Sequence, residues 1–276
     1  MQIAGYGTKL ALQVYADNVS ATKGFVDQVT WRNLMAISNR ARSPQPHLEF
    51  VAVLIASIFL FAGCATTQNV QQIDRLESVG ENPTILLMPP DIRYYLITAG
   101  GISEPHAEWT EAARKNFSSA VQDFAKDIGT NLVVMDDSDM TPLEVKYAKL
   151  HRAVGFTVLT NHFGMLKLPT KAGRFDWSLG PGISEVAEDY DADYGLFTYY
   201  RDEQASGGRV ALAVLAAVAG GSVSTGSEYG FASLVDLKTG DVVWFNVVNA
   251  GSGELRNPEG AVTAVSTLFK DIPTNR

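Results

Sequence analysis

The chain of 276 residues contains a single cysteine, Cys64. One cysteine forms no internal disulfide and supplies no multi-thiolate zinc site, so both of these ways of stabilising a small fold are excluded. Basic side chains are also scarce: 22 Lys and Arg face 30 Asp and Glu, which gives a formal net charge of −8. Nucleic-acid-binding proteins gain much of their affinity from Lys and Arg on phosphates. The charge balance therefore argues against a nucleic-acid partner.

Motifs of the common enzyme classes are missing as well. The chain has no G-x-S-x-G nucleophile motif, no phosphate-binding loop and no dinucleotide-binding glycine pattern. Residues 189–193 imitate the start of a calcium loop, but Tyr194 stands where that loop needs glycine. His151 and His162 are eleven residues apart, which can place them on one helix face but not on neighbouring turns. We predict a protein that is not an enzyme and has no metal. A further hypothesis is an enzyme whose catalytic site carries none of these motifs.

The residues around Cys64 point to a role for it. Residues 50–62 form an uncharged, apolar run of 13 residues. This run is shorter than the roughly 20 residues of a membrane span and typical of the apolar region of an export signal. Ala62 and Gly63 place small side chains directly before the cysteine. The pattern resembles the lipobox of bacterial lipoproteins. The alternative is a buried apolar helix with a free cysteine.

The lipobox resemblance has several implications. It implies cleavage between Gly63 and Cys64, a diacylglycerol thioether on Cys64 and a fatty acid such as palmitate on the new amino terminus. This covalent lipid would be the only attached group, and it would anchor the chain to the membrane. Ala65, rather than aspartate, follows the cysteine. In lipoproteins of the proteobacterial type this implies sorting to the periplasmic face of the outer membrane.

The length before Cys64 suggests where the signal begins. A start at Met35 would give a signal peptide over 35–63 with Arg40 and Arg42 in its basic region. We therefore interpret residues 1–34 as a spurious extension or a segment removed with the signal. Five of the basic and three of the acidic residues precede Cys64, so the remainder has a formal net charge of −10.

The part after Cys64 predicts one α/β domain. Residues 64–82 are polar and are interpreted as a flexible tether that carries the lipid, followed by a periplasmic domain over 83–276. We expect a mixed sheet of about five strands with helices packed on it: two early parallel strands, then a three-stranded antiparallel meander. The expected strands are 84–88, 131–135, 194–200, 229–235 and 242–248. The expected helices are 104–128, 142–166, 183–189 and 258–269. We expect Ser103 to cap the first of them and a loop containing Gly100-Gly101 to precede it. For residues 156–163, a strand is the alternative to the end of the second helix.

Three of these segments resemble a known group. They are Ile85-Leu-Leu-Met-Pro-Pro90 before a long helix, the strand after Ala192-Asp193-Tyr194, and a hairpin over 234–244 with the pattern V-D-x-x-T-G-x-x-x-W. Together they are similar to periplasmic lipoproteins of the curli-secretion and penicillin-binding-protein-activator type, and to the amino-terminal domain of the TolB translocation protein. The resemblance spans about 83–270 and implies an assembly, secretion or activator component. The chain shows no counterpart of the membrane-spanning hairpins of the curli exporter, so pore formation is not implied.

Two segments are candidates for contacts with partners. Residues 209–219 are apolar with small side chains; we expect either a buried helix or a contact with another copy or the membrane. The contact would use Val210, Leu212, Val214, Leu215 and Val218. The loop over 169–182 mixes charged and aromatic side chains, which suits either a binding rim or simple loop packing. The rim would use Lys171, Arg174, Phe175 and Trp177.

The leading hypothesis is a lipid-anchored outer-membrane lipoprotein. It would act without catalysis, as a scaffold, assembly or regulatory component of the bacterial envelope, with an unidentified envelope protein as partner or as a homo-oligomer. The alternative is a periplasmic lipoprotein that binds a small molecule or cell-wall glycan in a cleft near Trp177.

Overall fold

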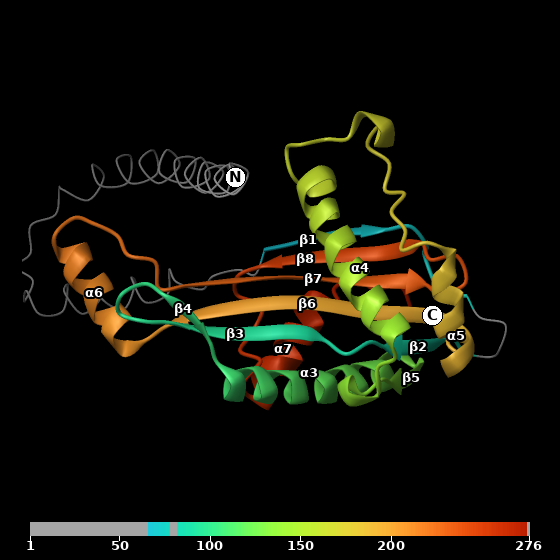
Figure 1. Cartoon of the computed structure of the whole chain (residues 1–276), viewed down its shortest axis with the longest axis horizontal. Helices are drawn as coiled ribbons and strands as arrows, with labels where there is room; N and C mark the ends of the chain where they lie inside the picture. The colour runs from blue at the N-terminus through green and yellow to red at the C-terminus, as the bar shows by residue number, and fades with distance from the viewer. Residues whose placement is uncertain (1–65, 78–81, 275–276) are drawn as a thin grey trace, which may run out of the picture. The chain divides into compact units, whose positions relative to one another are not determined.

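An eight-stranded mixed sheet organises the chain (Figure 1). The computed structural model describes residues 66–77 and 82–274. These residues belong to the second of two units into which the chain divides, Gly63–Arg276. The predicted signal peptide and its cleavage site at Gly63 and Cys64 lie outside the described residues. No described helix is long and apolar enough to cross a membrane.

The elements alternate between strands and helices along most of the chain. The strands are β1 (Thr66–Gln71), β2 (Thr84–Leu87), β3 (Asp91–Ile97), β4 (Ser103–Pro105), β5 (Asn131–Val134), β6 (Tyr194–Ala205), β7 (Gly226–Asp236) and β8 (Val242–Asn249). The α-helices are α3 (Ala107–Ile128), α4 (Pro142–Val158), α5 (Ser184–Tyr190), α6 (Gly207–Val218) and α7 (Pro258–Leu268).

The sheet contains the predicted parallel pair and the predicted antiparallel meander, and it contains further strands that were not predicted. Its order is β1-β8-β7-β6-β2-β5, with β3 beside β6 and β4 beside β3. The parallel pair is β2 with β5, and the antiparallel meander is β6–β7–β8. The prediction of about five strands was too low, because it missed β1, β3 and β4. The domain is nevertheless α/β with a mixed sheet, as expected.

The first missed strand lies in the predicted tether. Residues 66–71 are polar, yet they form β1 and pair antiparallel with β8 from Thr66 opposite Asn249 to Gln71 opposite Trp244. An edge strand is held by backbone hydrogen bonds on one side, so it can form without an apolar face. The tether interpretation is therefore wrong for this segment.

The other two missed strands replace the predicted loop around Gly100-Gly101. In β3 the side chains of Ile92 and Tyr94 are buried and Arg93 between them is exposed, the alternation of a strand with one face on the core. Gly101, with φ of 86°, turns the chain into β4. Ser103 is consequently part of β4 and does not cap the following helix.

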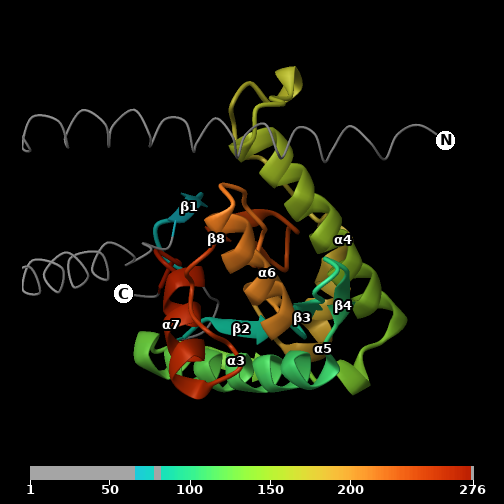
Figure 2. The same cartoon turned by 90° about the vertical axis from the view of Figure 1, so that its left-hand side faces the viewer.

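The helices cover both faces of the sheet. In Figure 2, α3 and α7 lie together on one side of the sheet and α4 rises on the other. Alternate side chains of the strands face the two layers: Tyr200 and Trp244 belong to the core under α3 and α7. Tyr199 and Phe245 belong to the core under α4 and α5. The central strands are buried on both faces, which is why they appear as continuous apolar runs.

Local signals in the sequence determine the ends of the long helices. The ring Nδ1 of His106 accepts the backbone N–H of Trp109 and caps α3, and Gly129 ends that helix in the left-handed conformation. Thr141 and Glu144 form a capping box at the start of α4. A π-helical turn over Leu159–Phe163 continues α4, so the alternative strand at 156–163 was wrong.

A buried histidine in α4 makes the domain sensitive to acid. His151 is buried, lies 2.6 Å from Ser233 Oγ through its Nε2, and stacks on Phe197 at 4.7 Å between ring centroids. Burial lowers the pKa of His151 to about 3. In the unfolded chain this group titrates near 6.5, so its contribution to stability is complete above pH 6.5 and is lost as pH falls toward 3.

We expect the free energy of unfolding to fall between pH 6.5 and pH 4, and His151→Gln to remove much of that fall. Burial raises the pKa of Asp202 to about 6, and this carboxyl stabilises the fold at low pH and loses that effect as pH rises from about 4 to 6. Because Asp202 contributes a pH dependence of the opposite sign, the effect of His151 is measured as a difference between wild type and variant. The quantity compared is the free energy of unfolding, obtained from urea unfolding at a series of pH values. A difference that does not change with pH would contradict the assignment to His151.

Candidate functional site

The strongest candidate for a contact surface is helix α6. Its N-cap Ser206 accepts the backbone N–H of Arg209, and the Arg209 side chain donates to the backbone carbonyl of Ser224. None of its residues is buried. All five large aliphatic side chains predicted for a contact are exposed, from 44% to 85% of their surface: Val210, Leu212, Val214, Leu215 and Val218.

The sequence predicted that residues 209–219 form either a buried helix or a helix that contacts another copy or the membrane. Because α6 is exposed, the prediction of a buried helix was wrong. A helix that is apolar on all sides is ordinarily buried in a core or a membrane. Arg209 is the only charged residue between 207 and 218. The 12 residues of α6 are too few for a membrane span, which needs roughly 20.

The position of α6 relates it to the predicted lipid. Figure 1 shows α6 at one end of the sheet, beyond the ends of β6 and β7 that it connects. Strand β1 starts part of the way along the sheet from that end: Thr66 pairs with Asn249, Asn249 with Tyr229, and Tyr229 with Arg201, four residues before the end of β6 at Ala205.

The covalent distance to Cys64 is short. Cys64 precedes Thr66 by two residues, which span at most about 7 Å. A lipid on this cysteine would lie within that covalent distance of the edge of the sheet at Thr66.

In the second predicted site, the loop over 169–182, the two aromatic side chains are not exposed as a binding rim would need. Phe175 and Trp177 are buried in the core on the α4 face. The loop pairs with the β7–β8 turn: Leu179 N–H donates to the Gly240 carbonyl at 2.8 Å, and Val242 N–H donates to the Trp177 carbonyl at 2.9 Å. This pairing draws the aromatic rings inward.

The charged residues of this loop serve its own structure. Lys171 pairs with Asp176 at 2.9 Å and lies 4.5 Å from the centre of the Trp177 ring. The hydrogen bond from Lys171 holds the pKa of Asp176 below its usual value. Arg174 is exposed and 3.7 Å from Asp176. The adjoining cavity holds about 60 Å³, too little for a drug-sized ligand or a glycan.

A cluster around Asp91 was not predicted. Arg201, on β6, is buried and donates to Asp91 Oδ1 at 2.8 Å, while Arg93 and Arg152 approach the same carboxylate at 3.6 and 3.5 Å. Their positions in the chain are far apart, so no spacing rule links them. The Pro89-Pro90 pair after a buried strand is the one local signal that marks this place.

No cluster of three or more His, Cys, Asp or Glu side chains in the described part of the chain is placed to hold a metal ion. His151 is buried in the core, whereas His106 caps α3 and is stacked on Trp109 at 3.9 Å between ring centroids. His162 contacts Phe163 and Phe175.

Comparison with known proteins identifies distant structural similarity only. No protein-family model and no curated protein matches the chain. A PelC dodecamer from Paraburkholderia phytofirmans matches with 11% identity and a TM-score of 0.33, over 74% of this chain and 97% of that chain. Lipoprotein GNA1162 from Neisseria meningitidis matches with 13% identity and a TM-score of 0.25, over 62% of this chain and 84% of that chain. At these values neither match carries an argument about function.

Proposed function

We propose that this chain is a lipid-anchored component of the bacterial envelope, and that α6 lies in the surface of the membrane that receives the lipid of Cys64. The observation that carries the proposal is the exposure of five large aliphatic side chains on α6, a helix at one end of the sheet whose one charged side chain is Arg209. The diacylglycerol and the fatty acid on Cys64 would anchor the chain firmly, and α6 would add a second contact with the membrane surface.

The proposed role is that of a scaffold or assembly component without catalysis. Anchoring at one end of the sheet would hold the long strands β6 and β7 and the opposite end of the domain at a defined distance from the membrane. With α6 in the membrane surface, the opposite end of the domain would face the periplasm and be available to an envelope protein.

The first test concerns the lipid. Cys64 is the only cysteine, so Cys64→Ala removes every site for a thioether lipid. In bacteria that express the full chain, we expect wild type to incorporate radiolabelled palmitate and to lose residues 1–63. The variant should incorporate no label and should retain its signal sequence. Wild-type protein that begins upstream of Met35, or that carries no lipid, would contradict the proposal.

A further inference from the structure

A groove of about 320 Å³ lies where the strand order of the sheet changes direction. After β2 the chain runs through β3, β4 and α3 to reach β5 on one side of β2, then returns through α4 and α5 to reach β6 on the other side. Helices α3 and α4 pack on opposite faces of the sheet. In open α/β sheets the crevice at the carboxyl ends of the strands at such a reversal is where ligands bind.

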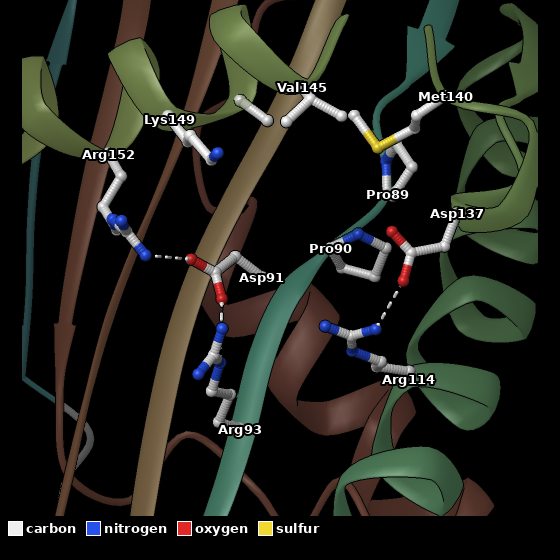
Figure 3. Close-up of a pocket in the computed structure, with 11 residues that line it drawn as sticks. Pro89, Pro90, Asp91, Arg93, Arg114, Asp137, Met140, Val145, Lys149 and Arg152 are labelled. Atoms are coloured by element: carbon white, nitrogen blue, oxygen red, sulfur yellow. Dashed lines mark hydrogen bonds and ion pairs between the residues drawn. The ribbon is translucent and has the colours of Figure 1, made fainter. Parts of the chain in front are cut away.

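The backbone at this crevice is irregular. Met88, Pro89 and Pro90 separate β2 from β3, and they insert one extra residue relative to β6: Leu87 pairs with Leu196 but Asp91 with Tyr199. An insertion of this kind bends a strand and redirects its side chains. Here it turns Asp91 and Arg93 toward the residues of α4 that line the groove (Figure 3).

Four cationic side chains line the groove, against two carboxylates. Arg93, Arg114, Lys149 and Arg152 come from β3, α3 and α4, and the carboxylates are Asp91 and Asp137. Figure 3 shows these groups converging from opposite sides, with Arg114 paired to Asp137 at 2.8 Å. This is a local excess of positive charge in a chain whose net charge is −8.

The excess of positive charge in the groove is larger than the count of four cations and two carboxylates indicates, because Arg201 neutralises Asp91. Buried Arg201 already donates to its carboxylate at 2.8 Å, whereas Arg93 and Arg152 lie 3.6 and 3.5 Å away, too far for strong hydrogen bonds. Lys149 has no hydrogen-bond or ion-pair partner among the described residues. Its ammonium group is therefore available to a ligand, and Asp91 holds Arg93 and Arg152 close together beside the groove.

We propose that this groove binds a small, soluble oxyanion that carries phosphate or carboxylate groups. Arginine guanidinium groups bind such groups with paired hydrogen bonds, and Lys149 would add a further charge. Pro89, Met140 and Val145 give the groove an apolar side, which suits an organic body attached to the anionic group. The binding of an oxyanion concerns a different part of the domain from α6 and does not depend on membrane attachment, whereas the choice of a soluble ligand rests on the proposed membrane contact of α6.

A soluble ligand fits this position better than a lipid headgroup. Asp91 pairs with Tyr199, six residues before the end of β6 at Ala205. At roughly 3.3 Å a residue this places the groove about 20 Å along the sheet from the start of α6. A membrane in contact with α6 would leave the groove in water.

The test uses the lipidated protein in neutral detergent, titrated calorimetrically with pyrophosphate and with citrate at constant ionic strength. We expect saturable binding of at least one of these probes. Lys149→Ala combined with Arg152→Ala should weaken it at least about tenfold, or about 1.4 kcal/mol. The matched control is Lys146→Ala, which removes a lysine from the same helix that does not line the groove.

Three results would overturn the proposal. They are no saturable binding of either probe, equal weakening by Lys146→Ala, or binding that chloride abolishes at the same ionic strength.

Because both groove side chains are partly or fully exposed, the double variant should fold, and its unchanged melting temperature without ligand is the check. A vesicle assay with phosphatidylglycerol separates the two sources of a phosphate group: retention that requires Lys149 and Arg152 would overturn the assignment to a soluble ligand.

Discussion

Replacement of Val214 and Leu215 by glutamine is expected to detach α6 from the membrane without unfolding the domain. Both side chains are exposed, by 59% and 66%, so their replacement should change the free energy of unfolding by less than about 0.5 kcal/mol. In a membrane surface the same two side chains would each contribute roughly 1.5–3 kcal/mol when fully buried. The polar variant should therefore lose most of the contact of the helix with lipid.

The solitary cysteine makes the measurement specific. With Cys64 consumed by lipid, Val218→Cys supplies a single thiol at the end of α6 for an environment-sensitive fluorophore. In vesicles its emission should shift to the blue and resist aqueous quenchers, and the glutamine variant should reverse both effects. The matched control is Lys238→Cys, in the β7–β8 turn at the opposite end of the sheet, where the label should stay exposed.

Two outcomes would contradict a membrane contact. One is a label at 218 that is quenched as readily as a label at 238. The other is protection that comes from a second copy of the chain, which a pyrene label at 218 would reveal as excimer emission. In that case α6 would be an interface between copies, and the glutamine variant should reduce the oligomer to monomers in detergent.

Gly155→Ala is expected to destabilise the domain, although alanine ordinarily favours a helix interior by about 1 kcal/mol. A Cβ at position 155 would lie 2.1 Å from Cε2 and 2.4 Å from Cζ of Phe231. No carbon atoms approach so closely, so α4 would have to move away from β7. Such overpacking costs typically about 1–3 kcal/mol and can cost more.

The measurement is urea unfolding of the purified protein, with Gly207→Ala as control. Gly207 is also helical, but its Cβ would meet no atom within 4 Å, so alanine there should be neutral or slightly stabilising. Phe231→Leu should relieve the clash, so that the double variant with Gly155→Ala is more stable than the two single effects predict. A higher unfolding midpoint for Gly155→Ala would show that α4 does not cross the sheet at this glycine.

The same glycine shows why part of the fold escaped prediction. From the sequence, Gly155 weakens a helix and favours the alternative of a strand at 156–163. The structure shows that it allows α4 to approach the ring of Phe231 on β7, some 76 residues later in the chain. A contact between such distant segments leaves no local pattern. By contrast, the alternation of Ile92, Arg93 and Tyr94 was a local signal for β3 that the interpretation as a loop missed.

The two segments predicted to contact partners also depended on the tertiary structure. Residues 209–219 and 169–182 both combine features of core and of surface, so composition alone left each of them open. Hydrogen bonds from the β7–β8 turn draw Trp177 into the core, whereas α6 has no comparable layer over it and stays exposed. The cationic groove collects side chains from β3, α3 and α4, and no segment by itself indicated it.

The sequence by itself determined the helices α3 and α4, the parallel β2–β5 pair and the β6–β8 meander, and it predicts lipidation at Cys64. These features depend on apolar periodicity, capping residues and turn residues within one or two segments. Only the tertiary structure decided that polar residues 66–71 close the edge of the sheet, that α6 is exposed, and that cations converge at Asp91. The physical reason is that burial and charge proximity depend on which distant segments the sheet brings together, and one segment does not carry that information.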